Sequence, residues 1–367
     1  MRRVGLAGQL LARAAAGLDR AVTLALRVTA PELETEPGIG TGHEARVGAL
    51  RAIEARYAEL DLSGFYPQPR RVEPVLRERR NFGGGLHRSD LVWESVGDTF
   101  LPELAETYRT TTANFVAHAR LMTRGEPRPV AILVHGYMMG QLRVDERVWP
   151  IHALDTLGFD CALTLLPFHG RRAHPGRQGL PEFPGRDPRF ASEGFRQAVT
   201  DLRELAGYLR RRGHPRVGLL GMSLGGYTAA LAATVDPSFD FLVPIVPLAS
   251  LADFALEHGD LPDAPEPRAL EHELIERVYR HVSPVEREPL IASERVLVIG
   301  ARADRIVQFS HARRLASHFR APLVSWHGGH LWQLGRGQAF ERLGQLLRTL
   351  PPLGVLSSAS DQALAGA

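Results

Sequence analysis

The 367-residue chain contains no lysine, since all 44 of its basic residues are arginine. A phosphate-binding loop of the G-x-x-x-x-G-K-[ST] type is therefore excluded, because that loop requires a lysine. Only one cysteine is present, Cys161, which excludes both an internal disulfide and a metal site built from several cysteines. We expect Cys161 to be a small buried strand residue and not a nucleophile.

Long runs of like charge are also missing. The chain has 44 arginines and 41 acidic residues, so its net charge is only +3. No basic stripe carries interleaved aromatic residues. Binding to nucleic acid is therefore not expected. His272 and Glu273 begin a zinc-protease motif of the H-E-x-x-H type, but Glu276 stands where the second histidine should be. The sequence predicts neither a metal nor a cofactor.

No apolar run near the start approaches the roughly 20 residues that a membrane-spanning helix needs. The longest uncharged stretch there covers residues 4–12, and Gln9 and Arg13 interrupt the pattern that a signal peptide would show. We therefore expect a cytoplasmic protein without a transmembrane anchor. Arginines recur at seven-residue intervals within residues 1–30, which predicts an amphipathic helix. Such a helix could pack on its own domain or lie on an anionic membrane surface, giving peripheral membrane contact.

The pattern of apolar and polar residues changes near residue 129. Residues 1–128 predict a helical extension followed by leading strands, with a helix over 43–60 and β-like runs over 90–95 and 115–122. From 129 to 350, short apolar runs alternate with helical segments, which predicts an α/β fold with a mostly parallel sheet flanked by helices. The predicted strands cover 130–134, 161–166, 217–220, 241–246, 296–299 and 323–326, and the predicted helices cover 192–211, 225–234, 309–319 and 336–349. We expect the tail, residues 351–367, to be flexible.

Two insertions follow predicted strand ends, where open α/β sheets keep their ligand crevice. The first, residues 168–190, is rich in arginine and proline. Its Arg171, Arg172 and Arg177 would either receive a carboxylate or phosphate of a substrate or form a solvated loop. The second insertion, residues 249–290, contains helical segments and is expected to form a cap over the site. A peripheral excursion on the far side of the domain is the alternative.

The chemistry-bearing motif is Gly221-Met222-Ser223-Leu224-Gly225, between an apolar run and an alanine-rich helix. A strand that turns this sharply into a helix needs small residues two before and two after the serine, and the strained turn exposes the serine hydroxyl. A serine hydroxyl also needs an adjacent base that a carboxylate orients. The pattern therefore predicts Ser223 as a nucleophile.

The base and the acid are both available downstream of Ser223. Asp304 follows the predicted strand over 296–299, and His330 follows the strand over 323–326, which gives the chain order Ser, Asp, His. His327 on the same loop and Asp253 in the insertion are the rival base and acid. We expect Asp304 to fix the imidazole of His330, and His330 to take and return the proton.

An oxyanion needs backbone donors, and a substrate needs an apolar pocket. His135-Gly136-Tyr137 follows the strand over 130–134, so we assign the donors to the N–H groups of Tyr137 and Leu224, and expect His135 to brace this loop. The residues predicted to contact the acyl group are Met138, Met222 and Phe254.

Residues 129–350 resemble the α/β-hydrolase-fold superfamily, in particular its esterase- and lipase-type serine hydrolases. The resemblance rests on the motifs above and on two further ones, Leu166-Pro167-Phe168-His169-Gly170 and Gly329-His330. The resemblance implies the same nucleophile, acid and base. The expected activity is cleavage of a small-molecule carboxylic ester through an acyl-enzyme. A peptidase, amidase or acyltransferase with the same triad, and a catalytically silent scaffold, are the alternatives. The sequence leaves the oligomeric state open.

Overall fold

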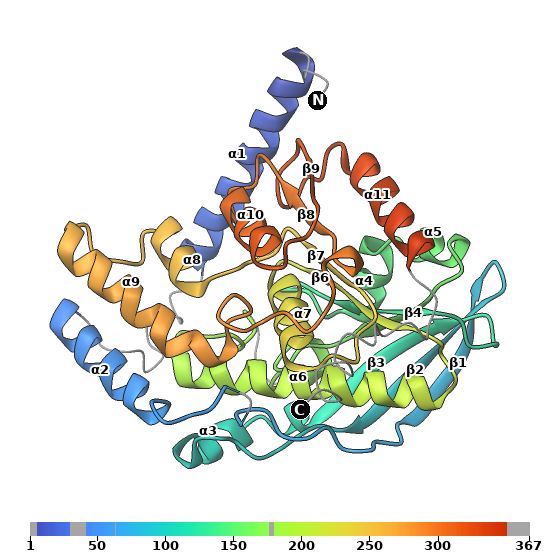
Figure 1. The fold of residues 1–367 in the computed structure, drawn as a ribbon, viewed down its shortest axis with the longest axis horizontal. Coiled ribbons are helices and arrows are strands. Elements are labelled where there is room, and N and C mark those ends of the chain that lie inside the picture. Colours follow the sequence, from blue (N-terminus) through green and yellow to red (C-terminus); the bar gives the residue numbers. More distant parts are fainter. Residues whose placement is uncertain (1–5, 30–41, 63, 176–179, 351–367) are drawn as a thin grey trace, which may run out of the picture.

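The computed structural model describes residues 6–29, 42–62, 64–175 and 180–350 (Figure 1). The predicted flexible tail and Arg177 lie outside these residues. Within the described part of the chain, nine strands form one sheet in the order β1-β2-β3-β5-β4-β6-β7-β8-β9. The strands are β1 (Val75–Gly83), β2 (Leu86–Glu94), β3 (Val116–Thr123), β4 (Val130–Val134), β5 (Asp160–Thr164), β6 (Val217–Met222), β7 (Leu242–Ile245), β8 (Val298–Ala301) and β9 (Leu323–Trp326).

In the order of the sheet, the six strands β5, β4, β6, β7, β8 and β9 pair in parallel, and they form the predicted part of the sheet. β1, β2 and β3 extend it through antiparallel pairs. Every residue of β4, β5 and β6 is buried, as expected of strands that helices cover on both faces. The α/β prediction is confirmed, and each of the six predicted strands is present within a few residues of its predicted bounds.

Helices cover the two faces of the sheet in separate layers. Ile132 and Val134 of β4 belong to one core cluster, and Ala131 and Leu133 belong to the other, because neighbouring side chains of a strand point to opposite faces. The first cluster includes side chains of α6 (Pro188–Arg211), α7 (Leu224–Val235) and α10 (Phe309–His318). The second includes side chains of α4 (Leu142–Val148), α5 (Ile151–Thr156) and α11 (Arg336–Thr349).

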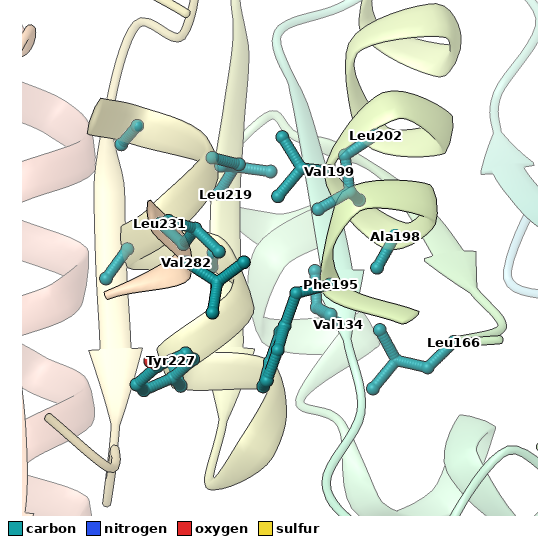
Figure 2. Packing of buried hydrophobic residues seen from close by; sticks show 14 of the residues in the cluster. Val134, Leu166, Phe195, Ala198, Val199, Leu202, Leu219, Tyr227, Leu231 and Val282 are labelled. Carbon is teal, nitrogen blue, oxygen red and sulfur yellow. The ribbon is translucent and has the colours of Figure 1, made fainter. Parts of the chain in front are cut away.

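Figure 2 shows how α6 closes the first layer. Its side chains Phe195 and Val199 point toward α7 and the strands, where they meet Tyr227 and Leu231, all of them fully buried. Val282, from the end of the second insertion, enters the same cluster. This packing fixes α7 against the sheet, and α7 begins immediately after Ser223.

The N-terminal extension adds α1 (Leu6–Thr29), α2 (His43–Arg56), α3 (Ala105–Arg109) and the strands β1 to β3. The N-terminal end of α1 stands clear of the other elements in Figure 1. Ala15 and Asp19 are the buried side chains in the described part of this helix. No helix among the described residues is both long and apolar enough to cross a membrane. Contact of residues 1–30 with a membrane surface stays a prediction.

The second insertion contains α8 (Leu251–Glu257) and α9 (Pro265–Tyr279), and α9 lies beside α2 (Figure 1). Glu271 of α9 is buried and accepts hydrogen bonds from Arg46 and His43 of α2, at 2.9 and 2.6 Å. On the other side, Arg314 of α10 pairs with Asp253 of α8 at 2.6 Å. The insertion is therefore held between the N-terminal extension and α10. Its role as a cap over the substrate stays a prediction.

Candidate active site

Ser223 lies at the sharp turn between β6 and α7. Its backbone has φ 56° and ψ −118°, a conformation that costs a non-glycine residue free energy and is typical of functional sites. A Cβ at Gly221 would overlap the carbonyl oxygen of Gly225, and a Cβ at Gly225 would overlap that of Val134. The two glycines of the motif are therefore required by close backbone contacts. Ser223 itself is buried, with 8% of its surface exposed.

Asp304 and His330 lie on the loops that follow β8 and β9, and the structure brings them together. Nδ1 of His330 is 2.7 Å from Oδ2 of Asp304. The other carboxylate oxygen, Oδ1, accepts the N–H groups of Ile306 and Val307 at 2.9 and 2.8 Å. Both carboxylate oxygens are thus engaged, and the proton on Nδ1 leaves Nε2 of His330 free to accept another.

The electrostatic surroundings of His330 favour its protonated form. Burial of the imidazole lowers its pKa, but the negative charge and hydrogen bond of Asp304 raise it, and the charge of Asp19 adds to that effect. The net result is a pKa of His330 above the ordinary value of 6.5. A base with a raised pKa has a stronger drive to accept a proton, but it is neutral only at higher pH.

Gln333 connects the loop of His330 with the serine turn. Its Nε2 lies 3.4 Å from the carbonyl oxygen of His330 and 3.9 Å from the sulfur of Met222, the residue before Ser223. The serine turn and the histidine loop are therefore neighbours at the same edge of the sheet.

The loop after β4 lies against Ser223. A Cβ at Gly136 would be 3.3 Å from the Cβ of Ser223, so the backbone of this loop passes directly beside the nucleophile candidate. Leu224 is the first residue of α7, and the first N–H groups of a helix have no acceptor within it. The N–H groups of Tyr137 and Leu224 remain the predicted oxyanion donors.

His135 braces this loop, as predicted. The N–H of Leu166 donates to its Nε2 at 3.0 Å, so Nδ1 carries the proton and donates to the carbonyl oxygen of Gly136 at 2.8 Å. Burial lowers the pKa of His135 to about 4, which keeps the ring neutral in this arrangement. His135 thus ties the loop after β4 to the loop after β5.

The rival base and acid lie elsewhere. His327 is exposed. Asp253 bonds to His272 of the insertion at 2.8 Å and to Arg314 of α10 at 2.6 Å. Asp253, His272 and Glu276 form a group whose ligand atoms lie within 4.8 Å of one another. Because Arg314 already contacts both carboxylates, a metal ion would have to compete with its guanidinium there.

The three predicted acyl-contact residues occupy different environments. Met138 is 51% exposed and has a positive φ of 63° in the loop after β4. Met222 is buried and belongs to the second core cluster. The ring of Phe254 lies tilted against that of His258, with ring centroids 4.0 Å apart, and Phe254 packs against the first core cluster. Their contact with a substrate stays a prediction.

Arg172 differs from both expectations for the first insertion, because it is neither a solvated residue nor a free cation at a site entrance. Its side chain is 1% exposed and pairs with Asp201 at 2.7 Å. It also donates to the backbone carbonyls of Leu165 and Asn114 at 2.9 Å. Its neighbour Arg171 is 60% exposed and lies 3.6 Å from Asp90. Arg172 therefore anchors the insertion from inside the protein.

Sequence reasoning missed Asp19, which lies on α1 and is fully buried beside His330. The signal in the sequence was its isolation, because it is the only acidic residue among residues 1–31. A single acid in a basic amphipathic helix does not by itself indicate what it contacts.

Comparisons with known proteins agree with this architecture. The prolyl oligopeptidase family model matches residues 196–325. Over 280 residues, the chain is 32% identical to the uncharacterized protein Rv2627c of Mycobacterium tuberculosis (strain ATCC 25618 / H37Rv), covering 73% of this chain. A protein of strain CDC 1551 / Oshkosh matches equally. The chain spans 65% of the length of these curated relatives.

Two solved structures share the fold at low sequence identity. An acetyl xylan esterase from Paenibacillus sp. R4 superposes with a TM-score of 0.52 and 16% identity, over 86% of this chain and 98% of that one. Acetyl xylan esterase 1 from Thermoanaerobacterium sp. JW/SL YS485 gives 0.54 and 18%, over 82% and 93%. The chain therefore has the α/β-hydrolase fold.

Proposed function

We propose that this protein cleaves a carboxylic ester of a small molecule through an acyl-enzyme formed on Ser223. The observation that carries the proposal is the 2.7 Å hydrogen bond between His330 and Asp304, on loops at the same edge of the sheet as the strained Ser223 turn. A nucleophile, a base and an orienting acid on three separate loops form a complete set for acyl transfer.

In the first half of the reaction, Nε2 of His330 takes the proton of the Ser223 hydroxyl while Oγ attacks the ester carbonyl carbon. Asp304 keeps the proton of the imidazole on Nδ1 and stabilises the imidazolium that forms. The N–H groups of Tyr137 and Leu224 stabilise the negative oxygen of the tetrahedral intermediate. The positive end of α7 favours the same charge. His330 then protonates the leaving alcohol, and the acyl group remains on Ser223.

In the second half, His330 removes a proton from water, and the resulting attack on the acyl carbon releases the carboxylic acid and restores Ser223. Every proton that leaves a nucleophile returns to a leaving group through the same imidazole. The chain's own residues thus supply each group that the proposed reaction needs.

A series of p-nitrophenyl esters from acetate to palmitate tests the proposal and measures the acyl pocket. We expect hydrolysis by the wild type with an optimum in acyl length, and a rate at least about a thousandfold lower for Ser223→Ala. Ser238→Ala, which changes an exposed serine on a turn, is the matched control and should retain the wild-type rate. Equal rates for wild type and Ser223→Ala would refute the proposal.

The prolyl oligopeptidase family match favours a peptidase as the second candidate. Ester and amide cleavage use the same nucleophile and base and differ in the leaving group. Peptidyl p-nitroanilides, including one with proline before the scissile bond, distinguish the two. Faster turnover of an anilide than of the ester with the same acyl group would replace the esterase by a peptidase. An α/β-hydrolase scaffold without activity would cleave neither.

A further inference from the structure

The carboxylate of Asp19 brings α1 into direct contact with the candidate triad. Asp19 is fully buried, and Ala15, also fully buried, lies one turn before it on the same face of the helix. The small side chain of Ala15 lets α1 approach the body of the protein closely at this point. The charged side chain is therefore buried at the place where the helix docks.

Three backbone N–H groups surround this carboxylate. Oδ2 accepts from His330 at 2.8 Å and from Arg305 at 3.2 Å, and Oδ1 accepts from Leu331 at 3.2 Å. Arg305 directly follows Asp304 in the chain. One carboxylate thus joins the loop that carries the acid to the loop that carries the base.

Gly329 shows that the protein accommodates this carboxylate closely. A Cβ at Gly329 would lie 2.5 Å from Oδ2 of Asp19. Any other residue before His330 would therefore push the carboxylate away from the two loops. The requirement for glycine at this position comes from α1, a segment more than 300 residues earlier in the sequence.

We infer that Asp19 is a positioning residue for the triad, which holds the backbone of Asp304 and His330 at the spacing that their hydrogen bond requires. This inference rests on the proposed serine hydrolase function. It makes α1 a structural part of the active centre, although the helix precedes the α/β core. Asp19 acts through the two loops and does not touch the reacting atoms.

The charge of Asp19 also reaches the imidazole. In the described part of the chain, the charged groups that raise the pKa of His330 are Asp304, from the loop after β8, and Asp19, from α1. A residue with a purely structural role would affect the rate through stability alone. Removal of this charge should in addition lower the pKa of His330.

Asp19→Asn tests the inference, because asparagine keeps the size of the side chain but has one acceptor oxygen for three N–H groups. The assay is the rate of covalent labelling of the full-length chain by a fluorophosphonate, measured across pH, since this rate does not depend on the identity of the substrate. We expect a maximal rate about 10- to 100-fold lower, as for a small displacement of a catalytic group. The half-maximal pH should also shift downward.

Arg20→Gln is the matched control, because it changes the charge of the neighbouring exposed residue on the same helix. It should leave the rate and the half-maximal pH unchanged. Asp19→Asn with wild-type labelling rate and wild-type pH profile would overturn the inference. A wild type that is not labelled at all would instead refute the proposed function.

A second measurement applies if Asp19→Asn does not fold. Hydrogen exchange on the wild type reports the backbone amides of Arg305, His330 and Leu331 directly. We expect all three to exchange slowly, because each donates to a buried carboxylate. Rapid exchange of these amides, in a protein whose strands are protected, would overturn the inference.

Discussion

Asp304→Asn is the substitution with the most specific expected outcome. The structure gives Asp304 two separate tasks, since Oδ1 accepts from the N–H groups of Ile306 and Val307 and Oδ2 accepts from His330. Asparagine can keep the first task with its amide oxygen. Its NH₂ group then faces Nδ1 of His330 and can only donate.

This reversal moves the imidazole proton to Nε2, the nitrogen that must accept the proton of Ser223. The loss of a correctly oriented base in a serine triad lowers the rate by about 10⁴, which corresponds to about 5 kcal/mol of activation free energy. The free energy of unfolding should fall much less, by about 1–3 kcal/mol for one charge-assisted hydrogen bond. The rate and the stability should therefore separate clearly.

The assay combines the turnover of a p-nitrophenyl ester with thermal unfolding. Asp253→Asn is the matched control, because Asp253 is the rival acid and lies in the insertion. We expect its turnover to stay close to the wild-type value. Turnover by Asp304→Asn within tenfold of wild type, or a larger loss for Asp253→Asn, would refute the assignment of the acid.

Three further predictions concern pH, the serine turn and the buried arginine. Turnover should rise with pH and reach half its maximum above pH 6.5, because His330 must be neutral to act as a base and its pKa is raised; a midpoint at or below 6.5 in a pH-rate profile would contradict this. Gly225→Ala should abolish labelling and lower the free energy of unfolding by about 3 kcal/mol or more, since its Cβ would overlap backbone of β4; a variant with wild-type melting temperature and labelling would contradict the turn geometry. Arg172→Met should lower the free energy of unfolding in urea by about 3–5 kcal/mol, because it leaves Asp201 buried without its charged partner. The double variant Arg172→Met with Asp201→Asn should recover part of that loss. An Arg172→Met variant as stable as wild type would contradict the buried pair.

The parallel sheet and the serine turn could be predicted from the sequence because short-range physics determines both. Strands such as β4 are buried on both faces, so they appear in the sequence as uninterrupted apolar runs. The glycines around Ser223 are fixed by contacts within the turn and with the neighbouring strand. The pairing of Asp304 with His330 followed from their places after successive strands.

The edge strand β1 could not be predicted in this way. Residues 77–80 are Arg-Glu-Arg-Arg, and they show no alternation of apolar and polar side chains. β1 is an edge strand, and its described residues are exposed except for the partly buried Phe82, so no buried face imposes alternation. Its strand conformation comes from its partner.

Asp19 and Arg172 illustrate the same limit for the site. Both are charged side chains that are buried because partners distant in the sequence satisfy them. Asp19 accepts hydrogen bonds from three backbone N–H groups. Arg172 pairs with the carboxylate of Asp201. Composition and periodicity favour exposure for such residues. Only the tertiary arrangement shows that each has a place inside the protein.

Mapping the site of a fluorophosphonate adduct tests whether Ser223 is the nucleophile of this chain. The full-length protein is labelled at pH 8, digested, and analysed by mass spectrometry. We expect an adduct on the peptide that contains Ser223, and its absence in Ser223→Ala. An adduct on a different residue, or labelling that persists in Ser223→Ala, would contradict it.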